Sequence, residues 1–442
     1  MWTPLLYLRV KWRSRDRRRQ GYDKFLQPLR TVYVGPSDLQ FSGGLPDHCR
    51  VPAVYGFGRE LGGDWDKTRY TLEREPFYRA LREVVEDGLA WSETTPYRDG
   101  KLSAETQESI RLFEDIYESV REHGYLSRRE MRFMNLPGTG KCGVDEVSVS
   151  IDRNGEFLFC DGRHRLAVAK LLGLPTIPVQ VAVRHSEWMA FRRRVEAYAQ
   201  GHGGRVPQPI PHADLDNVPA RLASDEVFGM IRDAMKSRPG AAVLDLGASW
   251  GYFCHRLEEL GYDCCAAEGS AEDLHFLGRL HRAANRRFEI VEESVPDGDD
   301  LGGRRFNAIL VVNGAADDGD PEVAKGLERL LESQQPDEVF VATASDRGGP
   351  HATPAGQGVV TRLAQSGLKY CTMLGTARDG SRLYRLTATL CVVLGMILAA
   401  SVFAHTPPWD VVEDSAEVLV AHWMRPWDIV EDTLELFGSA HL

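Results

Sequence analysis

The sequence predicts an α/β protein with two domains, and three observations lead to this fold class. First, residues 219–387 alternate short apolar runs with helical patterns, as expected for a mostly parallel sheet covered by helices. Second, a glycine-rich loop joins an apolar run to an amphipathic helix within residues 241–261. Third, residues 145–183 contain a hairpin, a short helix and another strand, which is typical of a smaller α+β domain.

Seven strands are expected in the C-terminal domain. The last two form a hairpin, because Asp379 and Gly380 provide a tight turn between them. The seven strands cover residues 243–246, 263–268, 288–294, 306–313, 337–344, 368–377 and 381–386.

The loop at residues 245–251, Asp-Leu-Gly-Ala-Ser-Trp-Gly, carries the strongest functional signal. Its glycines let the backbone approach a ligand, and the following helix offers free N–H groups and its positive dipole end. Glu268, about 20 residues further on at the end of the next strand, is placed to accept ribose hydroxyls. Ser249 and Tyr252 stand where a dinucleotide fingerprint needs glycine. The pattern therefore favours a different adenosine-type cofactor, the alternative being an ordinary tight turn.

The spacing Asp-x-Gly-x-x-x-Gly, together with seven strands and a closing hairpin, resembles class I S-adenosyl-L-methionine (SAM) dependent methyltransferases over residues 219–387. The resemblance implies a Rossmann-like methyltransferase domain in which the loop faces the methionine end of SAM. The cofactor residues that it implies are Asp245, Gly247, Ser249, Gly251, Glu268, Glu292, Glu293 and Asn313.

Catalysis in such a domain rests mainly on proximity and orientation, with at most one base. Asp317 and Asp318, after the fourth strand, are the candidate catalytic residues. No Asn-Pro-Pro-Tyr motif follows that strand, which disfavours amino methylation of nucleobases. A small-molecule, lipid or glycan acceptor is therefore expected.

In the first half, residues 161–165 (Asp-Gly-Arg-His-Arg) connect the hairpin to a helix over residues 166–172. Two guanidiniums and an imidazole at a helix N-terminus predict an anion site. The segment resembles ParB/sulfiredoxin-like domains over residues 125–190, and this resemblance implies a nucleotide triphosphate as ligand. Arg163 occupies the position of the sulfiredoxin cysteine, which excludes that chemistry. The candidate anion or nucleotide residues are Gly162, Arg163, His164 and Arg165, with Glu146 as the acid for phosphotransfer.

The alternative for this loop is a buried ion-pair network of Asp161, Arg163 and Arg165. No helix-turn-helix pattern follows, so sequence-specific DNA binding is not expected. A Gly-Gly-Asp-Trp-Asp segment at residues 62–66 precedes the hairpin, as in microbial proteins with a similar unit, and it suggests no function by itself.

The composition is that of a multidomain protein with 442 residues, a hydrophobic fraction of 43% and a net charge of −11. Residues 1–30 hold nine Arg or Lys and two Asp, a net charge of +7, which leaves −18 for the remainder. This balance argues against a general nucleic-acid binder. The eight cysteines show no paired spacing, so reduced thiols and no zinc or other metal site are expected.

The expected organisation follows from these segments. Residues 1–35 form a basic arm, 36–200 the ParB/sulfiredoxin-like domain with a helical N-terminal part, and 201–218 a Gly- and Pro-rich linker. The methyltransferase-like domain then covers residues 219–387.

Residues 386–404 contain no charged side chain and nearly reach the roughly 20 residues that span a bilayer. Arginines precede this segment and the acidic tail at 405–442 follows it, which predicts a single-pass protein on the cytoplasmic face of the cell membrane. The alternatives are a buried helix that caps the sheet, or a terminus displaced by a reading-frame error, in a cytoplasmic protein. The basic arm either lies on an anionic leaflet or is solvated. The tail repeats a Trp-Asp-(Val/Ile)-Val-Glu-Asp motif at 409–414 and 427–432, without an assigned role.

Three functions compete: SAM-dependent methyl transfer, a nucleotide-binding or phosphotransfer protein centred on residues 162–165, and a noncatalytic membrane-attached adaptor.

Overall fold

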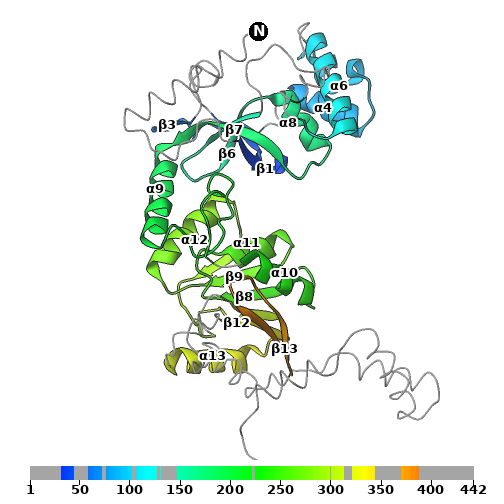
Figure 1. The fold of residues 1–442 in the computed structure, drawn as a ribbon. Coiled ribbons are helices and arrows are strands. Elements are labelled where there is room, and N and C mark those ends of the chain that lie inside the picture. Colours follow the sequence, from blue (N-terminus) through cyan, green and yellow to red (C-terminus); the bar gives the residue numbers. More distant parts are fainter. Residues whose placement is uncertain are drawn as a thin grey trace, which may run out of the picture. The chain divides into compact units, whose positions relative to one another are not determined.

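The computed structural model describes residues 31–43, 58–71, 76–101, 106–126, 130, 147–221, 224–298, 300–312, 321–343 and 370–387. The chain forms two compact units, one made mainly of residues up to 219 and the other mainly of residues from 220 onward. Each unit contains a seven-stranded sheet (Figure 1). The first unit also contains residues 279–286, and the second also contains residues 207–209.

The sheet of the second unit has the strand order β10-β9-β8-β11-β12-β14-β13. β8 to β12 are parallel, whereas β14 is antiparallel to both of its neighbours. The strands are β8 (Ala242–Leu246), β9 (Asp263–Ala267), β10 (Glu289–Val291), β11 (Ala308–Val311), β12 (Glu338–Thr343), β13 (Tyr370–Thr376) and β14 (Arg382–Thr387). The seven predicted strands and the closing hairpin are confirmed, and the architecture is Rossmann-like.

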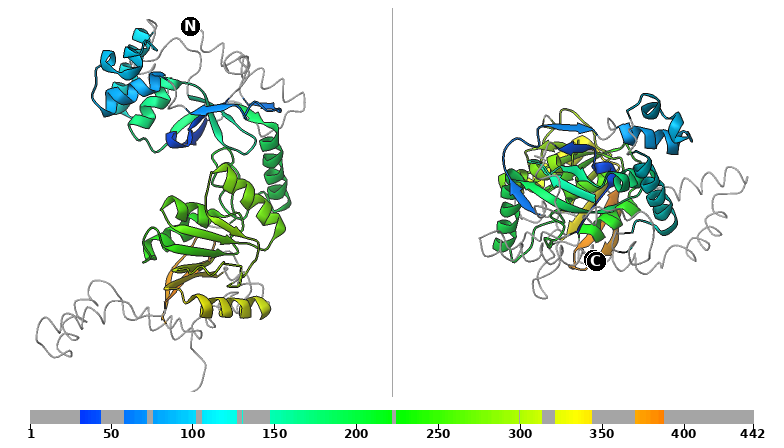
Figure 2. Two further views of the ribbon diagram at one scale, coloured as in Figure 1. Left: turned by 180° about the vertical axis from the view of Figure 1, so that it is seen from behind. Right: turned by 90° about the horizontal axis from the view of Figure 1, so that it is seen from above.

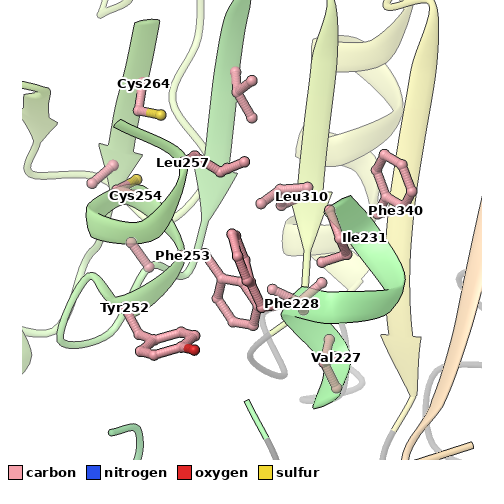
Figure 3. Packing of buried hydrophobic residues seen from close by; sticks show 14 of the residues in the cluster. Val227, Phe228, Ile231, Tyr252, Phe253, Cys254, Leu257, Cys264, Leu310 and Phe340 are labelled. Carbon is pink, nitrogen blue, oxygen red and sulfur yellow. The ribbon is translucent and has the colours of Figure 1, made fainter. Parts of the chain in front are cut away.

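Helices cover both faces of this sheet. Residues of α10 (Ser224–Ala234), α11 (Tyr252–Glu259) and α12 (Ala271–Ala283) share one buried cluster with one face of the sheet. The other face packs against α13 (Pro321–Gln334). Figure 3 shows Phe228 and Ile231 of α10 and Phe253 and Leu257 of α11 gathered beside Leu310 of β11. This core holds α11, and the loop before it, against the carboxyl end of β8.

The sheet of the first unit has the order β1-β7-β5-β6-β2-β4, with β3 paired to β7. Its strands are β1 (Thr31–Val34), β2 (Phe41–Gly43), β3 (Arg59–Leu61), β4 (Arg69–Thr71), β5 (Val147–Ile151), β6 (Phe157–Asp161) and β7 (Ile177–His185). The predicted hairpin is β5–β6, and its turn contains Gly155 at φ 104°. β1 differs from the expected basic arm, because Val32 and Val34 are buried and the strand pairs with β7.

The helices of the first unit gather around α8 (Arg163–Leu171). α4 (Pro76–Glu86) and α6 (Thr106–His123) share an apolar cluster with α8, and Figure 2 shows these light-blue helices beside it. α5 (Thr95–Arg98) is a single turn, and α9 (Ser186–Gly201) follows β7 directly. The predicted elements of this domain are therefore present, while its relation to ParB/sulfiredoxin-like domains stays a prediction.

No helix in the described part of the chain is long and apolar enough to cross a membrane. Leu386 and Thr387, where the predicted span begins, belong to strand β14. Residues 388–404 of that span, the tail at 405–442 and residues 1–30 of the arm lie outside the described residues.

Candidate functional site

The glycine-rich loop connects β8 to α11 through three residues in the left-handed region. Gly247, Ser249 and Gly251 have φ values of 63°, 53° and 83°. Glycine adopts this region without steric cost, whereas Ser249 adopts it against its preference. A Cβ on Gly251 would lie 2.4 Å from Leu277 Cδ1 of α12, so the loop also requires glycine there for close packing.

Glu268 directly follows β9 and holds the loop from one side. Its Oε2 accepts the N–H of Ser249 at 2.7 Å, and its Oε1 accepts the N–H of Ser270 at 2.8 Å. The residue is 7% exposed. Each carboxylate oxygen accepts more than one hydrogen bond, so both oxygens keep capacity for a ligand hydroxyl. The structure thus brings the predicted loop and the predicted ribose acid into direct contact.

Asp245, at the end of β8, is completely buried. Its Oδ2 accepts a hydrogen bond from Cys254 Sγ of α11 at 3.7 Å, while its Oδ1 has no hydrogen-bond partner. Burial raises the pKa of Asp245 to about 8, and the charge of Glu268 acts in the same direction. Burial also raises the pKa of the Cys254 thiol, which keeps that donor protonated. The loop therefore encloses a carboxyl group with one unsatisfied oxygen.

Gln208 joins the site although the sequence placed it in a linker. Its Oε1 accepts the N–H of Tyr252, the first residue of α11, at 3.2 Å. The side chain is fully buried, and Nε2 has no hydrogen-bond partner. Residues 207–209 belong to the second unit, in contrast to the residues that flank them. No local signal marks this glutamine, since its partner lies 44 residues further along the chain.

Trp250 fixes the far side of the loop. Its ring is fully buried and stacks on Phe276 of α12, with the ring centroids 4.1 Å apart. Its Nε1 donates to Asp273 Oδ1 at 2.9 Å. The large side chain in the middle of the loop is thus an anchor to α12.

The other predicted cofactor and catalytic residues follow strands β10 and β11 in the sequence. Glu292 and Glu293 follow β10 and are exposed. Asn313, Asp317 and Asp318 lie outside the described residues.

The predicted anion residues of the first unit point in different directions. Arg165 is buried, and its guanidinium donates to Tyr125 Oη at 3.0 Å and to the carbonyl of Leu126. Arg163 is exposed, with its guanidinium 5.4 Å from the ring of Phe77.

The backbone and imidazole of this segment have contacts of their own. The Gly162 N–H donates to Asp161 Oδ1 at 2.7 Å. The His164 ring packs edge-on against Phe77. Glu146 lies outside the described residues. Within the described contacts, Arg165 therefore serves the packing of the helices, and Arg163 is the arginine of this pair that faces solvent.

The Gly-Gly-Asp-Trp-Asp segment has a structural role that the sequence did not reveal. Asp66 is buried and receives the Arg153 guanidinium at 2.7 Å through both Nε and Nη2. Arg153 also donates to the carbonyl of Gly63 at 3.0 Å. Because Arg153 lies in the β5–β6 turn, the segment fixes that hairpin.

The expected linker is partly a piece of the first unit. Asp214 is fully buried, and its carboxylate lies 2.5 Å from Arg184 Nη2 and 3.0 Å from Arg192 Nη1. Burial opposes its ionisation, yet the two arginines lower the pKa of Asp214 well below its usual range. Trp188 Nε1 donates to the same carboxylate at 3.0 Å. Residues 210–219 are therefore anchored by a buried charge network.

The chain is similar to solved protein structures, but only at low sequence identity. No protein-family profile matches the chain, and no curated protein matches it in sequence. Magnesium protoporphyrin IX methyltransferase from Synechocystis PCC 6803, solved with bound SAM, is 15% identical, with 37% of this chain and 77% of that chain covered and a TM-score of 0.29.

Two further solved structures are similar to about two fifths of the chain. The methyltransferase domain of bacterial CtHen1-CN is 17% identical over 37% of this chain and 98% of that chain, with a TM-score of 0.31. Monomeric WbdD is 13% identical over 42% of this chain and 46% of that chain, with a TM-score of 0.32. The chain thus spans less than half the length of WbdD, and the fold class rests on the strand order of the second unit.

Proposed function

We propose that the chain is a SAM-dependent methyltransferase whose cofactor site is the loop between β8 and α11. The observation that carries the proposal is the contact of Glu268 with the Ser249 N–H at the carboxyl edge of the parallel strands. From β8 the chain continues to β9 and β10 on one side and returns to β11 and β12 on the other side, so the parallel sheet has a topological switch point between β8 and β11. Ligands of open α/β sheets bind outside the carboxyl ends of the strands at such a point.

The residues present fit this cofactor. Glu268 is an acceptor for the two ribose hydroxyls, and the start of α11 favours a negative group. When bound, SAM supplies an electrophilic methyl group on its sulfonium. The protein's contribution is to hold and orient the two reactants and to exclude water, which is a large share of catalysis in a bimolecular transfer.

Titration calorimetry of SAM into the full chain tests the proposal. Binding is expected in the wild type and at least about tenfold weaker in Glu268→Gln, because a hydrogen bond to a charged acceptor contributes about 1.5–3 kcal/mol. Glu272→Gln is the matched control, since this exposed carboxylate lies in the first turn of α12. A folded wild type that binds no SAM contradicts the proposal.

The acceptor belongs to the same proposal. We infer a small molecule, a lipid or a glycan, with Asp317 or Asp318 as the base that removes the acceptor proton. The net charge of −11 and the absence of an Asn-Pro-Pro-Tyr motif after residue 312 support this choice over a nucleobase. Transfer of a labelled methyl group to separated lipid, glycan and metabolite fractions distinguishes these acceptors.

Two accessory roles complete the proposal. The ParB/sulfiredoxin-like unit would bind an anion or a nucleotide triphosphate through Arg163, because this guanidinium is exposed at the start of α8. Loss of triphosphate binding in Arg163→Ala, with SAM binding retained, is the expected result. The part of the predicted span that follows β14, residues 388–404, would attach the protein to the cytoplasmic face of the cell membrane. Resistance of the full chain to carbonate extraction from membranes tests that attachment.

A further inference from the structure

The first residue of α10 carries a buried polar atom that lacks a partner. Ser224 is 1% exposed, and its Oγ has no hydrogen-bond partner among the residues that the structure describes. Folded proteins rarely leave a buried polar group unsatisfied, and such a group calls for a physical explanation. A ligand that reaches the start of α10 would supply the missing partner.

Contacts at both ends of α10 fix its direction over the sheet. Just beyond its last turn, the N–H of Ser237 donates to Glu338 Oε1, at the start of β12, at 3.0 Å. In its first turn, Asp225 accepts a hydrogen bond from the hydroxyl of Tyr252, which directly follows the glycine-rich loop. Figure 3 shows Tyr252 near the ends of the strands to which the arrows point. Ser224 therefore lies at the carboxyl edge of the parallel strands, on the same side as the loop.

Asp225 is a carboxylate that is held in one orientation and is still open to a ligand. Its Oδ1 accepts the Tyr252 hydroxyl, and the residue is exposed. Burial, together with the hydrogen bond to Asp225, raises the pKa of Tyr252 above its usual range, so the hydroxyl stays protonated and continues to donate. An ionised carboxylate accepts about four hydrogen bonds, so Asp225 keeps capacity for a further donor.

The charges at this edge of the sheet favour a cationic ligand. Glu292 and Glu293, which follow β10, add two exposed carboxylates to the edge. The guanidinium of Arg378 reaches the first turn of α10 but forms an ion pair with Glu226. A surface that carries charges of one sign attracts ligands of the opposite sign. A donor with a positive charge is therefore a better partner for Asp225 than a phosphate or a carboxylate.

We propose that Ser224 and Asp225 form the acceptor subsite and select a small molecule with a protonated amino group. Asp225 forms an ion pair with the ammonium, and Ser224 Oγ hydrogen-bonds to the same molecule. This inference rests on the proposed function and narrows its acceptor to a cationic small molecule. The ammonium is a recognition group and not the methylated atom, because a protonated amine has no lone pair with which to attack the methyl group.

The test supplies the full chain with SAM that carries a trideuteromethyl group and with a small-molecule extract of cells. Products that gain this group are identified by mass spectrometry after separation on a cation exchanger at pH 7. Asp225→Asn removes the charge but keeps an oxygen for the Tyr252 hydroxyl, and Ser224→Ala removes only a hydroxyl. Asp233→Asn, at an exposed position further along α10, is the matched control.

The wild type and Asp233→Asn are expected to yield a labelled product that binds the cation exchanger. At limiting acceptor, Asp225→Asn lowers this yield by about 10- to 100-fold, the usual effect of a lost hydrogen bond to a charged group. Ser224→Ala lowers it by about 3- to 10-fold, as expected for an uncharged hydrogen bond. Both variants keep the calorimetric affinity for SAM within about twofold of the wild type. Ser224→Ala also leaves the midpoint of thermal unfolding unchanged or raises it, because it removes an unsatisfied buried group.

Other results overturn the acceptor subsite. A wild type that binds SAM but labels no cationic product does so and leaves the proposed cofactor site intact. An unchanged yield in Asp225→Asn or Ser224→Ala has the same meaning. A loss of SAM affinity in Asp225→Asn that equals its loss of product would assign the residue to the cofactor instead. A wild type that binds no SAM overturns both proposals. Thermal unfolding of each variant verifies that the yields come from folded protein.

Discussion

The buried carboxyl group of Asp245 predicts how the free energy of unfolding depends on pH. This prediction can be tested without a ligand. A carboxyl group that stays buried and half satisfied holds its proton in the fold, and its pKa rises from the ordinary 3.8 to about 8. Between these two values the unfolded chain has lost the proton while the folded chain retains it. The contribution of Asp245 to the free energy of unfolding therefore falls as the pH rises from about 4 to about 8, and it is constant on either side of that window.

The magnitude follows from the width of the window. Each pH unit corresponds to about 1.4 kcal/mol for one proton, so the whole interval of about 4 units amounts to about 6 kcal/mol. Asp245→Asn removes this dependence, because asparagine does not titrate and fills nearly the same space. From pH 5 to pH 8, the difference in the free energy of unfolding between the variant and the wild type is expected to shift by about 4 kcal/mol in favour of the variant.

Urea unfolding of both proteins at unit steps from pH 4 to pH 9 measures this difference. Glu272→Gln is the control, because it removes a carboxylate from an exposed site on α12. The titratable groups that face Asp245 are the Cys254 thiol and the Glu268 carboxylate, and both remain in the variant. A free-energy difference between Asp245→Asn and the wild type that is the same at pH 5 and pH 8 refutes the reasoning.

Three further changes test the loop and the buried charges by urea unfolding. Ser249→Gly is expected to stabilise by about 1 kcal/mol, because glycine relieves the left-handed backbone at φ 53°; a loss of stability contradicts this. Gly251→Ala is expected to destabilise the protein by more than about 2 kcal/mol, since its Cβ would lie 2.4 Å from Leu277 Cδ1; an unchanged free energy of unfolding would mean that Leu277 of α12 moves aside. Asp214→Ala is expected to cost about 3–5 kcal/mol, because Arg184 loses its buried partner; an unchanged free energy shows that water replaces the carboxylate.

Local patterns were enough to predict the second unit. Its strands are short apolar runs, and the loop and Glu268 are separated by a single helix and strand. The partners therefore lie close in sequence, and the periodicity of the side chains determines which face is buried. The contact between Ser249 and Glu268 spans only 19 residues.

Contacts between distant segments were not predictable in this way. Arg153 meets Asp66 across 87 residues, and Gln208 meets Tyr252 across 44. Arg165 follows the same rule, since the anion-site pattern is local but Tyr125, its actual partner, lies 40 residues earlier. The sequence shows which residues can bind an anion, whereas the tertiary fold decides which of them faces solvent.

Asp245 connects the stability of the second unit to its proposed function. A residue kept for stability alone would be better as asparagine, because burial of the carboxyl group disfavours folding at neutral pH. Proteins retain such groups where a ligand uses them. Asp245→Asn is therefore expected to change two properties in opposite directions, with higher stability above pH 5 and weaker binding of SAM. Both changes in one variant would show that the unsatisfied oxygen serves the cofactor, whereas higher stability with unchanged SAM affinity would assign Asp245 no part in binding.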